Sequence, residues 1–269
     1  MTHKIILDTD PGIDDAMAIL FAEAHPAIDL LAITTVFGNA TIENGTRNAL
    51  WLKQKYGMRA EVAQGAAAPL LREPVGPTTV VHGPSGLGDV EAGEVTLAPD
   101  PRPAWQYIVE TVKANPGEIT LVTIGPLTNL ALALEAAPEI TALVKQVVVM
   151  GGAFGVNGHR GNVTPYAEAN IHDDPEAADR VFTAPWPVVI IGLDVTQQSF
   201  FSSAYLDALR DDAGEPGRFL WAVSRFYLRF YSERIGLNGC HVHDPSAIAY
   251  VIDPELFTLR EGPVRVIDH

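Results

Sequence analysis

One run near the amino terminus organises the chain: Lys4-Ile5-Ile6-Leu7-Asp8-Thr9-Asp10-Pro11-Gly12-Ile13-Asp14-Asp15-Ala16-Met17-Ala18-Ile19-Leu20. Its apolar beginning predicts a buried parallel strand, which ends at the Pro-Gly pair. Beyond that pair, the apolar positions recur at helical spacing and predict a helix. Four carboxylates therefore crowd a single strand-to-helix turn: those of Asp8, Asp10, Asp14 and Asp15.

These four acids indicate a bound cation. Asp8 and Asp10 are two residues apart, so their side chains leave the same face of an extended strand, whereas Asp14 and Asp15 fall in the first turn of the helix. The partial positive charge at a helix N-terminus tolerates the two later acids, but it cannot neutralise all four. Carboxylates packed this closely either raise one another's pKa or hold a cation. An all-oxygen ligand set without His or Cys favours Ca²⁺ or Mg²⁺ over zinc.

The composition is typical of a globular α/β protein. The chain has 269 residues, 47% of them hydrophobic, so it can bury a large core, and we expect residues 1–269 to form a single domain. Its formal net charge of −15 would repel nucleic acid and anionic membranes. No apolar run reaches the roughly 18 residues of a spanning helix, and the start does not resemble a signal peptide. With Cys240 as its one cysteine, we expect a cytoplasmic protein.

Strands and helices alternate along the rest of the chain. Apolar and β-branched runs predict further strands at 28–36, 60–63, 119–124, 147–150 and 187–193. Helical spacing predicts helices at 43–56, 105–114, 127–137, 174–183, 205–212 and 218–234. Residues 65–103 are rich in Gly and Pro and predict an extended surface excursion. The alternation favours a Rossmann-like α/β fold, with a mostly parallel central sheet flanked by helices on both faces.

Polar residues collect where the predicted strands end, which is where ligands bind in open parallel sheets. They are acids, amides, imidazoles and one hydroxyl: Asp8, Asp10, Asp14, Asp15, Asn39, Thr128, Asn129, Asn162, Glu168, Asn170, Asp194, His241, His243 and Asp244. Lysine and arginine are nearly absent there, which argues against a phosphate ligand. Sugar hydroxyls fit better, because carboxylates and amides hydrogen-bond them and two adjacent hydroxyls can chelate a hard cation.

The same residues carry a family resemblance. The octet Asp8-Thr9-Asp10-Pro11-Gly12-Ile13-Asp14-Asp15 closely resembles the signature of the nucleoside N-ribohydrolases, the inosine-uridine preferring nucleoside hydrolases. The resemblance continues in order along nearly the whole chain, at Phe37-Gly38-Asn39, Gly125-Pro126-Leu127-Thr128-Asn129, Met150-Gly151-Gly152, Ala167-Glu168-Ala169-Asn170, Asp174-Pro175-Glu176 and His243-Asp244-Pro245. It implies the nucleoside hydrolase fold, a nucleoside substrate and a homo-oligomer, either a dimer or a tetramer. Relatives usually extend a few dozen residues further, so the C-terminus is short by comparison.

The resemblance also implies roles for individual residues. Asp10, Asp15 and Asp244 would bind Ca²⁺ together with the backbone carbonyl of Ile124. Asp10 would in addition act as the general base that takes a proton from the attacking water, and Asp8 would support the cluster without binding the ion. A further polar group would hold the ribose: Asp14, Asn39, Asn162, Glu168 and Asn170.

Cleavage of an N-glycosidic bond also requires a proton donor near the base. Positive charge builds up on the ribose while electrons move into the base, so acids belong beside the sugar and a donor beside the base. His243 is the candidate donor, because it adjoins Asp244 and an unperturbed imidazole pKa near 6.5 suits general acid catalysis. The resemblance places His82, Tyr227 and Tyr231 on the base side as well. The sequence leaves open whether His241 takes part and which nucleobase is preferred.

Two other functions share parts of this pattern. An aspartate-dependent Mg²⁺ phosphohydrolase also carries Asp-x-Asp after a strand, but Lys145 is not followed by the late acidic pair that such chemistry uses. A non-catalytic Ca²⁺-dependent nucleoside or sugar binder would need neither a base such as Asp10 nor a donor such as His243. The sequence therefore predicts Ca²⁺-dependent hydrolysis of purine or pyrimidine ribonucleosides to ribose and free base.

Overall fold

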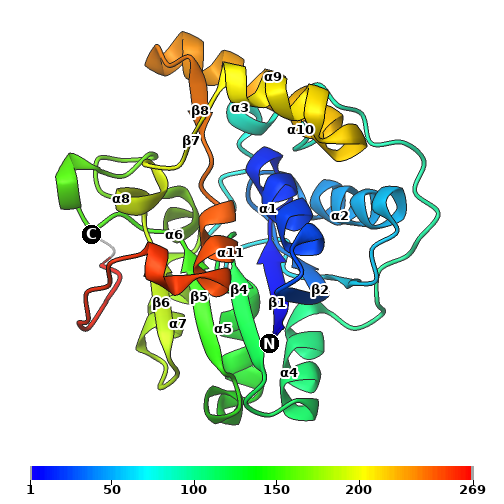
Figure 1. The fold of residues 1–269 in the computed structure, drawn as a ribbon. Coiled ribbons are helices and arrows are strands. Elements are labelled where there is room, and N and C mark those ends of the chain that lie inside the picture. Colours follow the sequence, from blue (N-terminus) through cyan, green and yellow to red (C-terminus); the bar gives the residue numbers. More distant parts are fainter. Residues whose placement is uncertain (1, 268–269) are drawn as a thin grey trace.

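A six-stranded sheet forms the centre of the molecule (Figure 1). The computed structural model describes residues 2–267. The strand order is β3-β2-β1-β4-β5-β6, and every neighbouring pair is parallel. The strands are β1 His3–Thr9, β2 Ile28–Thr35, β3 Glu61–Gln64, β4 Ile119–Thr123, β5 Gln146–Met150 and β6 Val188–Ile191. This order is typical of Rossmann-like folds, and it confirms the predicted α/β class and parallel sheet.

Helices cover both faces of the sheet. The longer ones are α1 Ile13–Ala24, α2 Ile42–Tyr56, α4 Ala104–Ala114, α5 Thr128–Ala136, α7 Pro175–Thr183, α9 Ser203–Asp212, α10 Gly214–Ile235 and α11 Pro245–Ile252. Short helices are α3 Thr79–His82, α6 Ala169–Asp173 and α8 Leu193–Thr196, and 3-10 turns lie at Pro138–Ala142, Val156–Gly158 and Pro254–Leu256. Within the described part of the chain, no helix has both the length and the apolar content to cross a lipid bilayer.

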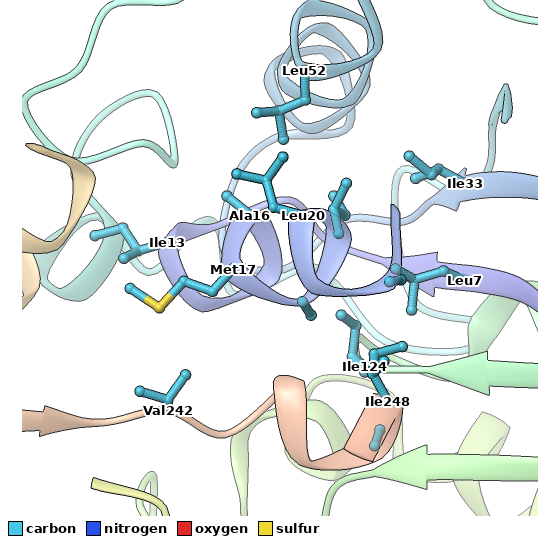
Figure 2. Packing of buried hydrophobic residues seen from close by; sticks show 14 of the residues in the cluster. Leu7, Ile13, Ala16, Met17, Leu20, Ile33, Leu52, Ile124, Val242 and Ile248 are labelled. Atoms are coloured by element: carbon cyan, nitrogen blue, oxygen red, sulfur yellow. The ribbon is translucent and has the colours of Figure 1, made fainter. Parts of the chain in front are cut away.

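Two buried apolar clusters lie on opposite faces of the sheet because strand side chains alternate in direction. Leu7 of β1 belongs to the cluster formed with α1, α2, α10 and α11, whereas its neighbour Ile6 belongs to the cluster formed with α4, α5 and α7. Figure 2 shows the first cluster. The side chain of Met17 points from α1 toward the side on which Val242 and Ile248 of α11 lie, and Leu52 of α2 lies on the opposite side of α1. Helix α1 is thus enclosed by apolar side chains from both ends of the sequence.

The structure differs from the sequence-based expectations mainly in the last third of the chain. An antiparallel pair, β7 Phe200–Ser202 and β8 Gly239–His241, and the helix α11 were not expected. Residue Leu193 begins α8 instead of ending a strand, because β6 stops at Ile191 and Gly192 follows. Within the excursion 65–103, α3 and a bridge between Ala63 and Asp100 give the loop local order.

The packing on the α1 face predicts the cost of a core truncation. Ile33 of β2 is fully buried, so Ile33→Ala is expected to lower the free energy of unfolding by about 3 kcal/mol through lost apolar burial and a residual cavity. Urea denaturation would measure it. Ile235→Ala is the matched control, because this isoleucine at the end of α10 is 54% exposed and its truncation is expected to change stability by less than about 0.5 kcal/mol. Equal losses in both variants would contradict this description of the core.

Candidate active site

The site begins at the turn between β1 and α1, at the carboxyl edge of the sheet. Strand β1 ends at Thr9, Gly12 has extended backbone angles, and α1 begins at Ile13, so two acids occupy its first turn. Neighbouring β4 lies on the other side of β1 from β2, and this is the point in a Rossmann-like sheet where ligands bind. The acids gathered there are all buried: Asp8, Asp10, Asp14, Asp15, Glu168 and Asp244.

Asp8 supports the cluster from within the sheet. It pairs in register with Thr34 of β2, whose hydroxyl donates to Asp8 Oδ1, and the same oxygen accepts from Asn129 Nδ2 at 2.8 Å. Asn129 also donates to the Thr35 carbonyl at 2.9 Å and accepts from the Ala66 amide at 2.9 Å. The buried amide of Asn129 therefore joins β1, β2 and the start of the excursion 65–103 behind the acidic turn.

Asp10 has one carboxylate oxygen held and one free of donors. Its Oδ2 accepts from the Asn39 backbone amide at 2.7 Å, whereas no donor among residues 2–267 reaches the buried Oδ1. Two glycines permit the close approach of neighbouring loops: a Cβ on Gly38, where φ is +149°, would lie 2.1 Å from Asp10 Oδ2, and one on Gly125 would lie 2.7 Å from Oδ1. Asp10 Oδ1 is thus a buried, crowded oxygen that lacks a protein partner.

Asp15 is fixed by three donors. The Thr9 hydroxyl donates to Oδ1, and Oδ2 accepts from the Gly12 amide at 2.8 Å and from Asn39 Nδ2 at 2.9 Å. The contact with Gly12 satisfies an amide at the start of α1, as an acidic residue three positions into a helix commonly does. Asn39, which follows β2, therefore orients both Asp10 and Asp15.

Asp244 brings the distant end of the chain to this turn. It immediately precedes α11, and that helix packs against α1. Asp14, Asp15 and Asp244 each offer a carboxylate oxygen within 4.8 Å of the others, an arrangement that could hold a metal ion. The backbone of His243 and the hydroxyl of Tyr227 lie close enough to Asp14 to lower its pKa, against the larger effect of burial.

The electrostatics of this cluster favour a bound cation. Burial, followed by repulsion from Asp15, raises the pKa of Asp10 well above its ordinary value. Burial and the charges of Asp14, Asp15, Asp10 and Glu168 do the same to the pKa of Asp244, and burial raises that of Asp14 to about 7. Buried carboxylates that repel one another either bind protons or pair with a cation. The donor-free Oδ1 of Asp10 and the all-oxygen ligand set fit a hard divalent ion such as Ca²⁺.

The loop that ends in α6 supplies the next group. Glu168 caps α6: its carboxylate accepts from the amides of Asn170 at 3.0 Å, Gly152 at 2.9 Å and Ile171 at 3.2 Å, and burial raises its pKa to about 7. Asn170 Nδ2 donates to the Ile124 carbonyl at 3.0 Å and to the Met150 carbonyl at 3.1 Å. Glu168, Asn170 and Ile124 therefore meet at the ends of β4 and β5.

Asn162 is the predicted ribose residue whose position is fixed from the loop before α6. Its side chain is exposed, and its Oδ1 accepts from the Ala169 amide at 3.0 Å, which links it to the residue after Glu168. Among residues 2–267 it makes no hydrogen bond to Asp10, Asp14, Asp15 or Asp244. Its assignment to the ribose stays a prediction.

His243 lies on the side of the cluster formed by α8 and α10. Its Nδ1 is 2.7 Å from the hydroxyl oxygen of the fully buried Thr196, and its Nε2 is 3.2 Å from the hydroxyl oxygen of Tyr231. Burial lowers the pKa of His243 to about 3. The imidazole is therefore uncharged at pH 7, and its pKa lies well below the value near 6.5 that the sequence alone would indicate. Thr196 and Tyr231 fix the orientation of the ring.

His82 and Tyr227 complete this wall. His82 Nδ1 accepts from the Ile13 amide at 3.1 Å, so it caps α1 from the excursion 65–103, and its ring centroid lies 5.6 Å from that of Tyr227. Burial lowers the pKa of His82 to about 3, so its Nε2 carries the proton. Tyr227 and Tyr231 are buried and their rings meet edge to face at 5.0 Å. The sequence placed these residues on the base side; the structure brings them beside Asp14 and His243.

His241 adjoins the same wall from strand β8. Its ring packs against Tyr231 at 5.5 Å and Phe200 at 5.6 Å, and its buried Nδ1 has no hydrogen-bond partner among residues 2–267. Burial lowers its pKa. These contacts make His241 part of the packing behind Tyr231.

Two residues near the site were not singled out from the sequence. Thr196 ends the short helix α8 and carries no charge, so only its contact with His243 reveals it. Asp173, at the end of α6, raises the pKa of Asp10 and Glu168 by its charge. The adjacent Asp174 has a structural role: it caps α7 and accepts from Thr128 at 2.7 Å.

The parallel sheet, the buried acid cluster and the facing histidine and tyrosine side chains define a Rossmann-like α/β protein whose site could hold a metal ion. Residues 5–269 match the sequence profile of the family described as inosine-uridine preferring nucleoside hydrolase. The chain belongs to this family, and it is a ribonucleoside hydrolase enzyme. The predicted family and enzyme class are confirmed, which sets aside the phosphohydrolase and the non-catalytic binder.

Individual relatives match over nearly all of the chain. It is 42% identical over 269 residues to the inosine-uridine preferring nucleoside hydrolase of Leishmania major, covering 99% of this chain and 84% of that protein. It is 41% identical over 264 residues to a probable uridine nucleosidase 1 of Oryza sativa subsp. japonica, covering 98% and 81%. Among solved structures, the plant nucleoside hydrolase PpNRh1 matches with a TM-score of 0.95 and 39% identity, covering 98% and 83%.

The acid cluster predicts a stability response to divalent cations. Ca²⁺ added to metal-free enzyme at a hundred times its dissociation constant is expected to raise the free energy of unfolding by about 2.7 kcal/mol, because the ion binds only the folded cluster. Thermal unfolding with and without Ca²⁺ would measure this.

Asp244→Asn is expected to abolish that response while the metal-free protein stays folded, since one repelling charge is removed from the cluster. Asp212→Asn makes the same substitution at an exposed site at the end of α9 and should keep the full response. An unchanged Ca²⁺ response in Asp244→Asn would show that the ion binds elsewhere.

Proposed function

We propose that this enzyme hydrolyses the N-glycosidic bond of ribonucleosides by direct attack of water, giving ribose and the free base, with Ca²⁺ held in the acid cluster. The observation that carries the proposal is the buried group formed by Asp14, Asp15 and Asp244 next to the donor-free oxygen of Asp10. Family membership supplies the reaction class, and the oxygen-only set of ligands supports Ca²⁺ as the ion.

The division of the acids between ion and substrate follows the family resemblance and is supported by the free oxygen of Asp10. Asp10 Oδ1 accepts from no donor among residues 2–267, and Asp15 and Asp244 each offer an oxygen to one ion. We therefore assign Asp10, Asp15, Asp244 and the Ile124 carbonyl to the ion, and Asp14, which lies beside Tyr227 and His243, to the substrate. When bound, Ca²⁺ lowers the pKa of a water molecule and attracts two adjacent sugar hydroxyls.

The acids also suit the charge that develops on the sugar. As the N-glycosidic bond breaks, the ribose ring gains positive charge, and fixed carboxylates stabilise it more strongly in a buried site than they would in water. Asp10 is positioned to take the proton from the attacking water, because its Oδ1 is unpaired and its Oδ2 is anchored by Asn39. Ribose hydroxyls would be held by the remaining polar groups: Asp14, Asn39, Asn162, Glu168 and Asn170.

The departing base needs a proton or a strong hydrogen bond. Burial raises the pKa of Tyr231 far above its ordinary value, so its hydroxyl keeps its proton beside His243. The Tyr231 hydroxyl, linked to the neutral His243, can therefore offer a strong hydrogen bond to a base bound on this side, with His82 and Tyr227 completing the wall. Relatives named for uridine and for inosine-uridine support testing both a pyrimidine and a purine nucleoside.

Loss of the Asp10 carboxylate, the proposed general base, is expected to stop turnover with every nucleoside. Asp10→Asn keeps the size of the side chain and an oxygen for Asn39 but removes the proton acceptor, so kcat for uridine, cytidine and inosine should fall roughly a thousandfold. Released ribose measured in Ca²⁺ buffer would report it, with Asp212→Asn as the control. Near wild-type activity in Asp10→Asn would refute the assignment.

The contact between Thr196 and His243 predicts a graded loss of activity. His243→Ala should lower kcat about 100-fold for substrates whose base needs protonation. Thr196→Val removes the hydroxyl that orients the imidazole and should lower kcat about tenfold with little change in KM, because ribose binding is untouched. Thr196→Ser keeps the hydroxyl and should recover most of the activity. Equal kcat values in Thr196→Val and Thr196→Ser would show that the Thr196 hydroxyl does not orient the His243 imidazole.

The compartment and the oligomeric state stay proposals. A cytoplasmic location is supported by Cys240, which is buried and unpaired, as expected of a chain that folds under reducing conditions. A homo-oligomer, dimer or tetramer, is expected from the resemblance to the family, and sedimentation of the purified protein would test it.

A further inference from the structure

A polar cavity lies away from the acid cluster, between α10, the start of α9 and the residues that lead into β8. These elements pack together in the upper part of the molecule (Figure 1). The cavity has a volume of about 300 Å³. Its polar side chains come from Ser203, Arg225, Arg229, Ser232 and Asn238, and none of the described residues that line it is acidic. In a chain with 33 acids and 18 Lys and Arg residues, such a lining is unusual.

Arg225 carries an uncompensated charge on the wall of this cavity. The Nε and Nη2 atoms of its guanidinium are buried and have no hydrogen-bond acceptor among residues 2–267. The group packs over the ring of Trp221, with 4.7 Å from Cζ to the ring centroid, and this contact holds the guanidinium without neutralising it. A partly buried cation without an anion is costly to the folded protein, so an incoming anion would be bound favourably.

The other polar groups of the lining are mostly hydrogen-bond donors. Ser203 donates to Asn238 Oδ1 at 2.8 Å, which leaves the Asn238 amide nitrogen available to a ligand. Among residues 2–267, Arg229 forms an ion pair with one carboxylate, that of the exposed Asp89, at 2.7 Å through Nη2. Guanidinium, amide and hydroxyl donors around one space are the groups that recognise a phosphate or similar oxyanion.

We propose that this cavity, defined by Arg225, Arg229, Ser232 and Asn238, is a binding site for a small phosphate monoester. The guanidinium groups and the amide pair with the phosphate oxygens, and the side chains of Leu228 and Leu237 line the space for the organic part of the ligand. A volume of about 300 Å³ is at the lower end of the range of small-molecule sites and exceeds the need of inorganic phosphate alone.

The cavity is separate from the acid cluster but shares structural elements with it. Tyr227 and Tyr231 of α10 lie beside Asp14 and His243, whereas Arg225, Leu228 and Ser232 line the cavity on another face of the same helix. On the opposite wall, Gly239 starts the strand that leads to His241 and His243. A ligand here would contact both elements that carry the base-side wall without entering the active site.

Binding to the dialysed, metal-free full-length enzyme tests the proposal, because it does not depend on catalysis. Inorganic phosphate and phenyl phosphate would be titrated at constant ionic strength, with heat release and ³¹P line broadening as readouts. We expect saturable binding of both, at least several times tighter for phenyl phosphate because of the leucine side chains. Arg225→Met should weaken binding at least tenfold, whereas Arg234→Met, which removes the same charge from an exposed position on the same helix, should leave it unchanged.

Asn238→Asp is a second variant, which tests the proposal even if Arg225→Met fails to fold. Asn238 is exposed, its Oδ1 contact with Ser203 can persist, and the new carboxylate would pair with the free guanidinium and repel the ligand, so phosphate binding should be lost. Equal affinity in the wild type, Arg225→Met and Asn238→Asp would overturn the proposal. It would also fail if, without added anion, Arg225→Met dissociates an oligomer in sedimentation, because the occupant would then be a carboxylate of a second copy.

Discussion

The structure depends on an electrostatic conflict, since several carboxylates share a space from which water is largely excluded. Burial raises the pKa of Asp10, Asp14 and Asp244, and each charge adds to the effect on its neighbours. The N-terminus of α1 and the donors on Asp15 reduce the repulsion without removing it. A hard cation resolves the conflict by replacing repulsion with shared attraction. The capacity of this site to hold a metal ion thus arises from how the chain places its own acids.

A surrounding set of uncharged residues makes the arrangement possible. Asn129 and Thr34 hold Asp8 in the sheet, Asn39 holds two acids at once, and Thr196 holds His243. Gly38 allows a loop to approach Asp10 where any side chain would collide with its carboxylate. Geometry at the centre is therefore maintained by amides, hydroxyls and the absence of a side chain, and the charged groups are left available for chemistry.

Much of this could be predicted from the sequence, because the signals were local. The run from Lys4 to Leu20 contains a strand, a turn and a helix start, and its four acids necessarily share one turn. Helix α11 and the pair β7–β8 were missed: α11 is short and almost uniformly apolar, so it lacks helical periodicity, and strands of three residues carry too little pattern. Thr196 could not be found, because its role depends on a contact across 47 positions of sequence. The neutral His243 likewise follows from burial, which sequence does not reveal.

The pairing of Asp15 with Asp244 has a consequence for synthesis. More than two hundred residues separate the two acids, and β1 with its turn leaves the ribosome long before α11 exists. The early part of the chain can form its strands and apolar contacts, but its cluster of acids lacks a partner until the late segment arrives. Completion of the acid cluster is consequently a late event in synthesis, and a chain interrupted before residue 244 would keep the early acids without the carboxylate that joins them.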